Sequence, residues 1–100
     1  MKTYTLSLVE AMKLLHILRC HWEVRSEDPD EVCMIQDCIY TILGGTFNEY
    51  YVKYEATMQQ AFTIWLYADA YFEFCKTQND NEELENAKVL RSKLGGGAGV

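Results

Sequence analysis

Apolar and small residues recur along the middle of the chain at alternating intervals of four and three positions. Such spacing places side chains on one face of an α-helix, so it predicts a single continuous helix over residues 47–76. A helix of this length would be the spine of the fold, and its face is unusually rich in aromatic rings. The members of the series are Phe47, Tyr51, Tyr54, Met58, Ala61, Trp65, Ala68, Phe72 and Cys75.

Three shorter helices are predicted, two before this long one and one after it. Gly44 and Gly45 follow the second of them, and glycine commonly ends helices because it tolerates the left-handed backbone conformation. The predicted ranges and buried residues are 8–25 with Leu8, Met12, Leu15 and Trp22; 29–43 with Val32, Ile35, Ile39 and Ile42; and 81–94 with Leu84, Ala87 and Leu94.

Each predicted helix is preceded by a capping box. In this motif a Ser, Thr or Asp and a Glu three residues later each accept a hydrogen bond from a backbone N–H that lacks a helical partner. Pro29 adds a further start signal, because the first helical position needs no N–H. The four pairs are Ser7/Glu10, Asp28/Glu31, Thr46/Glu49 and Asp80/Glu83.

Residues 3–8 alternate between polar and apolar positions, which is also the pattern of a β-strand. An isolated strand is unstable without a partner, and the four-helix interpretation leaves it none. The predicted fold class is therefore all-α: a single-domain bundle of four helices over residues 1–94, followed by a flexible glycine-rich tail at 95–100.

Composition supports one domain with a substantial core, since 49% of the 100 residues are hydrophobic. We expect a cytoplasmic protein with reduced cysteines, because neither a secretory signal nor a membrane-spanning stretch is recognisable. The long aromatic helix is too apolar for so small a chain to cover. A homodimer is predicted, in which Tyr54, Trp65 and Phe72 divide between core and interface.

The net charge of −6 is distributed unevenly, with a net of −11 between residues 26 and 87. Direct nucleic-acid binding is disfavoured, because attraction to phosphates requires a basic surface. The acidic residues could instead imitate nucleic acid, or they could simply be solvated side chains that favour helix N-termini.

A zinc-binding protein is a less favoured alternative. His16 and Cys20 are four residues apart, which would place two ligands on one helical face, with His21 next to them. Cys33 and Cys38 are five apart and diverge on a helix. We expect no cofactor and no enzymatic activity, because no thiol has a base placed to activate it.

The function predicted from these features is a small acidic protein-binding module. It would act as an inhibitor or adaptor docking on a larger protein, for example one that handles nucleic acid, as is typical of phage and mobile-element accessory proteins. The alternative is a structural homodimerisation module without an acidic docking face. The acidic residues predicted to bind the partner are Glu27, Asp28, Asp30, Glu31 and Asp37.

Overall fold

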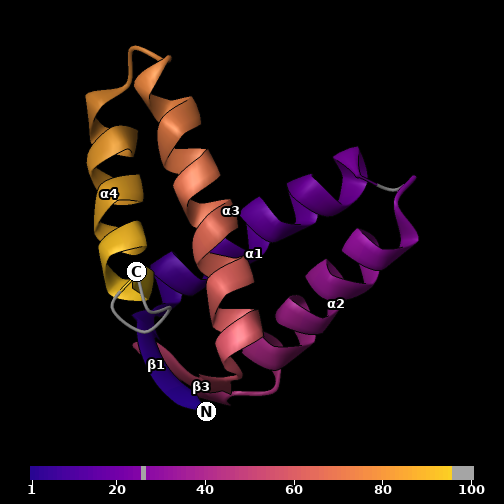
Figure 1. The fold of residues 1–100 in the computed structure, drawn as a ribbon. Helices are drawn as coiled ribbons and strands as arrows, with labels where there is room; N and C mark the ends of the chain where they lie inside the picture. The colour runs from indigo at the N-terminus through magenta and orange to yellow at the C-terminus, as the bar shows by residue number, and fades with distance from the viewer. Residues whose placement is uncertain (26, 96–100) are drawn as a thin grey trace.

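The protein consists of two helical hairpins that diverge from a small antiparallel sheet (Figure 1). This arrangement comes from a computed structural model that describes residues 1–25 and 27–95. The first hairpin joins α1 to α2 and the second joins α3 to α4, with the sheet at the end where they meet. The elements are β1 (Lys2–Ser7), α1 (Leu8–Val24), α2 (Pro29–Leu43), β2 (Thr46–Phe47), β3 (Tyr51–Ala56), α3 (Met58–Lys76) and α4 (Asn81–Gly95).

The sheet has the order β1-β3-β2, and both pairings are antiparallel. The β1–β3 register runs from Lys2 opposite Ala56 to Ser7 opposite Tyr51. Successive side chains of a strand point to opposite faces, so the sheet has a polar face and a core face. Thr3, Thr5, Lys53 and Glu55 are exposed, and the residues that face the core are Tyr4, Leu6, Val52, Tyr54 and Ala56.

The prediction of one helix over residues 47–76 is wrong for its first part. The 4-3 series also contains the period-two alternation of a strand, since Val52, Tyr54 and Ala56 are buried and the residues between them are exposed. Tyrosine and valine favour strands. The side chain of Asn48 accepts hydrogen bonds from the backbone N–H groups of the two following tyrosines, Tyr50 and Tyr51, which forms the turn into β3.

The rejection of a strand at residues 3–8 is wrong for the same reason. Its pairing partner is β3, which the helical interpretation had absorbed into the long helix. One misassigned segment thus produced both errors, and the fold is mostly helical with a small sheet rather than a pure four-helix bundle.

Three of the four predicted helix starts are confirmed. Ser7 and Glu10 form the reciprocal capping box, Asp28 accepts from the N–H groups of the first turn of α2, and Asp80 accepts from the N–H of Glu83. The Thr46/Glu49 pair is wrong, because Thr46 lies in β2. The actual capping box of α3 is Thr57 with Gln60, in which both hydrogen bonds are present.

The buried face of α1 also differs from the prediction. Met12 is 68% exposed and Trp22 is 37% exposed, whereas the buried residues are Ala11, Leu14, Ile17 and Leu18. Because α1 carries apolar residues around most of its circumference, spacing alone could not select the face. In the other two helices, Ile35, Ile42, Ala87 and Leu94 are buried as predicted, and Val32, Ile39 and Leu84 are partly buried. Gly95 is the last residue of α4, and the rest of the predicted tail lies outside the described residues.

Candidate protein-binding groove

An apolar groove of about 560 Å³ opens between α1 and α3, in the angle between the two hairpins. Two large apolar side chains remain uncovered along it: Val24 is 80% exposed and Phe74 is 57% exposed. The lining residues are His16, Ile17, Cys20, His21, Val24, Arg25, Ala70, Tyr71 and Phe74.

Helical spacing assembles the groove from two faces that the core does not use. On α1, His16, Cys20 and Val24 follow one another at intervals of four, beside the buried face of that helix. On α3, Ala70 and Phe74 follow the same interval. The divergence of the hairpins keeps the two faces apart, so each presents apolar area that its own chain leaves in solvent.

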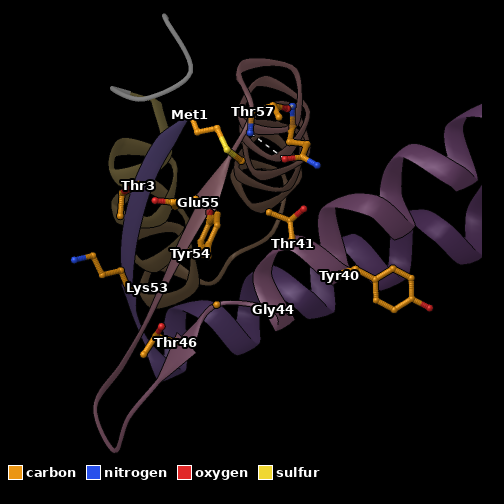
Figure 2. A pocket seen from close by; sticks show the side chains of 12 residues that line it. Met1, Thr3, Tyr40, Thr41, Gly44, Thr46, Lys53, Tyr54, Glu55 and Thr57 are labelled. Atoms are coloured by element: carbon orange, nitrogen blue, oxygen red, sulfur yellow. Dashed lines mark hydrogen bonds between the residues drawn. The ribbon is translucent and has the colours of Figure 1, made fainter.

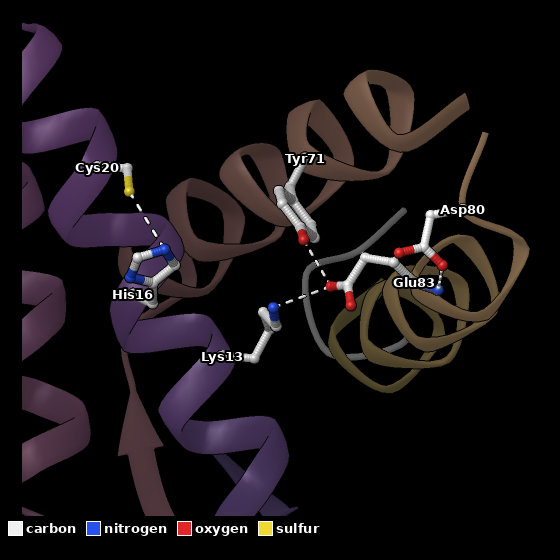
Figure 3. Close-up of polar contacts among 6 residues, drawn as sticks. All are labelled: Lys13, His16, Cys20, Tyr71, Asp80 and Glu83. Atoms are coloured by element: carbon white, nitrogen blue, oxygen red, sulfur yellow. Dashed lines mark hydrogen bonds and ion pairs between the residues drawn. The ribbon is translucent and has the colours of Figure 1, made fainter. Parts of the chain in front are cut away.

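A polar cluster ties α1 to the second hairpin next to the groove. The Tyr71 hydroxyl donates to a carboxylate oxygen of Glu83 at 2.5 Å, and the ammonium of Lys13 lies 3.0 Å from the same oxygen. Figure 3 shows Tyr71 and Lys13 pointing toward Glu83 from α3 and α1 respectively. These contacts hold the pKa of the Glu83 carboxyl below its ordinary value, the hydrogen bond from Tyr71 contributing most.

A second polar cluster joins the two hairpins where α2 passes near α3. The Tyr67 hydroxyl donates to Glu31 at 2.5 Å, and the Arg25 guanidinium lies 3.2 Å from the same carboxylate. The His21 ring packs on the Tyr67 ring with centroids 4.4 Å apart. Burial lowers the pKa of His21, and the charge of Arg25 lowers it further against a smaller opposing effect of Glu31. His21 therefore favours its neutral, more apolar form at the groove wall.

The candidate zinc ligands are only partly brought together. His16 Nε2 and Cys20 Sγ are 3.6 Å apart on the groove wall (Figure 3), as their spacing predicts. Cys33 is exposed on α2, and Cys38 is buried in the core, where burial and then the charge of Asp37 raise its pKa to about 12. Within residues 1–25 and 27–95, no group of three or more candidate ligands converges on one point.

The predicted partner-binding acids separate into two groups. Glu27, Asp28 and Asp30 lie at the turn between α1 and α2, exposed at the outer end of the first hairpin. The other two make internal contacts: Glu31 binds Tyr67 and Arg25, and Asp37 accepts from the side chain of Gln60 at 2.6 Å.

The three aromatic residues predicted for the interface are largely buried within the protein. Tyr54 is 2% exposed in the sheet, Phe72 is 7% exposed against α4, and Trp65 is partly buried against the core. Exposed aromatic area lies instead at neighbouring positions of α3, where Phe62 is 46% exposed and Phe74 is 57% exposed.

The distribution of ion pairs leaves unbalanced negative charge at the outer ends of both hairpins. Six ion pairs neutralise most of the basic residues: Lys13–Glu83, Arg19–Glu23, Arg25–Glu31, Lys76–Glu73, Arg91–Asp69 and Lys93–Glu10. Among the described residues, the acids at the two hairpin ends that form no ion pair are Glu27, Asp28, Asp30, Asp80, Glu82 and Glu85. The apolar groove thus lies between two acidic ends.

A second hollow, of about 660 Å³, lies on the other side of the molecule between β3, the end of α2 and the start of α3 (Figure 2). Its walls mix polar and apolar groups and include Thr41, Thr57, Lys53 and Glu55, with opposite charges on one strand. A partner would have to replace the hydration of these groups, so the apolar groove is the better candidate for a binding surface.

The groove was not predicted from the sequence, although one signal was present. Residues 8–25 are apolar on more than one helical face, and the segment predicted as one long helix has a second apolar line through Phe62 and Leu66, with Phe74 near it. The direction of the two hairpins decides which of these faces meet, and no single-helix pattern contains that information.

Comparison of the chain with protein-family models, with curated proteins and with solved structures finds no match. None of the helices formed by the described residues combines the length and the apolarity needed to cross a bilayer. The groove and its charges are therefore the basis for a functional argument.

Proposed function

We propose that this protein is a protein-binding module that receives a basic amphipathic helix of a partner protein in the groove between α1 and α3. The observation that carries the proposal is an apolar groove in the angle between two hairpins whose outer ends carry acids without ion pairs. A helix with an apolar face would fill the groove, and its flanking lysines or arginines would meet the acids.

The sequence-based prediction of an inhibitor or adaptor agrees with this mode of binding. Helices rich in lysine and arginine are common in proteins that contact phosphate groups of nucleic acids. A module that covers such a helix would compete with nucleic acid for it, or would join it to another protein. The same acids that cap helices would then also attract the partner.

Two exposed cysteines of the chain allow binding in the groove to be measured. Cys20 lines the groove and is exposed, whereas Cys33 is exposed on α2 outside the groove lining. We suggest measuring alkylation of both thiols in the presence of a synthetic leucine–lysine helix of about 18 residues, which would span about 27 Å. Binding in the groove slows alkylation of Cys20 and leaves Cys33 unchanged. If the peptide changes the alkylation rate of neither thiol, the groove is not the binding site.

Two peptide controls and one pair of variants sharpen the experiment. A peptide of the same composition with its apolar face scrambled should not protect Cys20, and a leucine–glutamate helix should not either. Phe74→Ser should weaken binding about tenfold or more, whereas Phe62→Ser, a similarly exposed ring that does not line the groove, should not.

A double variant, Glu27→Gln with Asp30→Asn, tests whether the acids attract the partner. These two residues make neither an ion pair nor a side-chain hydrogen bond in the described part of the chain, so the fold should tolerate the change. Peptide affinity should fall, and its dependence on salt should decrease, since fewer screened charges contribute. Unchanged affinity would show that the acids do not attract the partner.

A further inference from the structure

The outer edge of β1 carries backbone groups that its own chain does not use. In an antiparallel pair, residues alternate between those that exchange hydrogen bonds with the partner strand and those whose N–H and C=O point away. The Leu8 N–H donates to Tyr50 O, which continues the ladder and assigns the even residues of β1 to pairing with β3. The Ser7 N–H is directed elsewhere, to Glu10, as this alternation requires.

Thr3 and Thr5 therefore point their N–H and C=O groups outward from the sheet. No strand lies on that side of β1 in the part of the chain that the structure describes, and no hydrogen bond between described residues uses these groups. Both threonines are exposed, and Figure 2 shows Thr3 on β1 beside Glu55 of β3. β1 contains no proline, and its single charged residue, Lys2, lies at the exposed first position, so the Thr3–Thr5 stretch of the edge carries no charge of its own.

We propose that a second copy of this chain pairs with this edge, β1 against β1 in antiparallel orientation. The segment Thr3-Tyr4-Thr5 is palindromic, so a two-fold axis at Tyr4 places Thr3 of each copy opposite Thr5 of the other. The outward N–H and C=O groups of both threonines then pair in full. Cross-strand threonine pairs and aromatic pairs are favourable, and the Tyr4–Tyr54 stack continues across the axis. The two three-stranded sheets become one sheet of six strands.

Charge explains why two acidic chains would meet at this end. Each copy carries −6, but six of the nine acids without ion pairs in the described part of the chain lie at the outer ends of the hairpins, away from the sheet. Around the sheet, Lys2 and Lys53 offset Glu49 and Glu55, so this end repels a second copy less than the acidic hairpin ends do. The pairing consumes the β1 edge of both copies, and the opposite edge, β2, is only two residues long, so assembly stops at two.

The first test is the molar mass by light scattering at micromolar concentration. The expected mass is twice the 11.6 kDa of the chain. A monomer at all concentrations up to about 1 mM would overturn the proposal. Masses that continue to increase with concentration would also overturn it, because the proposed contact closes.

A pair of double variants tests the register. Thr3→Lys with Thr5→Glu places opposite charges across the axis twice and should preserve or strengthen the dimer. Thr3→Lys with Thr5→Lys places like charges there and should raise the dimer dissociation constant about tenfold, since like charges directly opposite each other destabilise a strand pair. Equal dissociation constants for the two would overturn this interface.

Thr5→Pro gives an independent measurement. Its N–H points away from β3, so proline removes only the hydrogen bond between copies, and proline is tolerated on edge strands. This variant should be a folded monomer, whereas Thr5→Val, which keeps the N–H, should remain a dimer. A folded Thr5→Pro dimer would contradict the proposal. If the β1 edge instead binds an extended peptide of another protein, the wild-type chain alone should be a monomer. The groove lies at the other end of the molecule, so these outcomes do not depend on peptide binding there.

Discussion

The ring of Tyr4 stacks on the ring of Tyr54 inside the protein, with centroids 5.4 Å apart and planes inclined by 21°. Both hydroxyls are buried, and neither has a hydrogen-bond partner among the described residues. Burial raises the pKa of both phenols. An unpartnered buried hydroxyl costs free energy because it has lost its water.

We therefore expect Tyr54→Phe to raise the free energy of unfolding by about 1 kcal/mol, measured by urea denaturation. Tyr67→Phe is the matched control, because the Tyr67 hydroxyl does have a partner in Glu31. That variant should lose about 1–3 kcal/mol, as hydrogen bonds to charged groups are the stronger ones. If Tyr54→Phe is destabilising by a similar amount, the Tyr54 hydroxyl has a partner after all.

The start of α3 is tested by two threonines. Thr57→Ala should lower the free energy of unfolding by about 1 kcal/mol, because it removes the oxygen that accepts from the Gln60 N–H. Thr46→Ala should change it by less than about 0.5 kcal/mol, since Thr46 is exposed in β2 and caps no helix. The reverse order would favour a helix that begins near residue 47.

Gly45 is required because the turn after α2 passes directly against β3. A Cβ at this position would lie 2.5 Å from the Lys53 carbonyl oxygen and 2.9 Å from Tyr54 Cβ. Gly45→Ala should therefore cost about 1–3 kcal/mol, the range for overpacking. Gly44→Ala should cost less, because a Cβ at that position would come no closer than 3.1 Å to its nearest neighbour, the Tyr40 carbonyl oxygen. Thermal unfolding of the two variants checks the order.

Acid should weaken the tie between α1 and the second hairpin. The pKa of Glu83 is lowered by the hydrogen bonds from Tyr71 and Lys13, so the folded state favours its charged form. This stabilisation is complete above the ordinary carboxyl pKa and is lost as the pH falls through the lowered folded-state pKa.

We expect Glu83→Gln to be less stable than the wild type at about pH 7, and the difference to shrink toward about pH 3. Glu85→Gln, at an exposed position of the same helix, should differ little from the wild type at either pH. A difference for Glu83→Gln that does not change with pH would mean that the carboxylate charge is not what stabilises the cluster.

The sequence predicted α2 and α4 almost to the residue, because their caps and breakers are local. Asp28 with Pro29 and Asp80 with Glu83 are short-range signals, and here no strand pairing competes with them as it does at Thr46. The sheet was missed because its evidence is long-range: the strand at Tyr51–Ala56 becomes recognisable only when the strand at Lys2–Ser7 is placed beside it.

For the candidate site, the sequence predicted exposed acids but not the groove between them. Glu27 and Asp30 lie on the surface as expected, since charged side chains rarely enter a core. Phe74 and Val24 were not foreseen as exposed neighbours, because their proximity depends on the angle at which two hairpins leave the sheet.

The pairing of β1 with β3 also sets an order of events during synthesis. Residues 8–50 separate the two strands, so the ribosome needs roughly two to nine seconds after finishing β1 before it reaches β3, at about 5–20 residues per second. During that interval α1 and α2 can form from local contacts, but the core faces of Tyr4 and Leu6 have no strand beside them. The nascent chain therefore contains the β1 segment without its pairing strand until β3 is made. A chaperone that shields such segments would act before residue 51 is made.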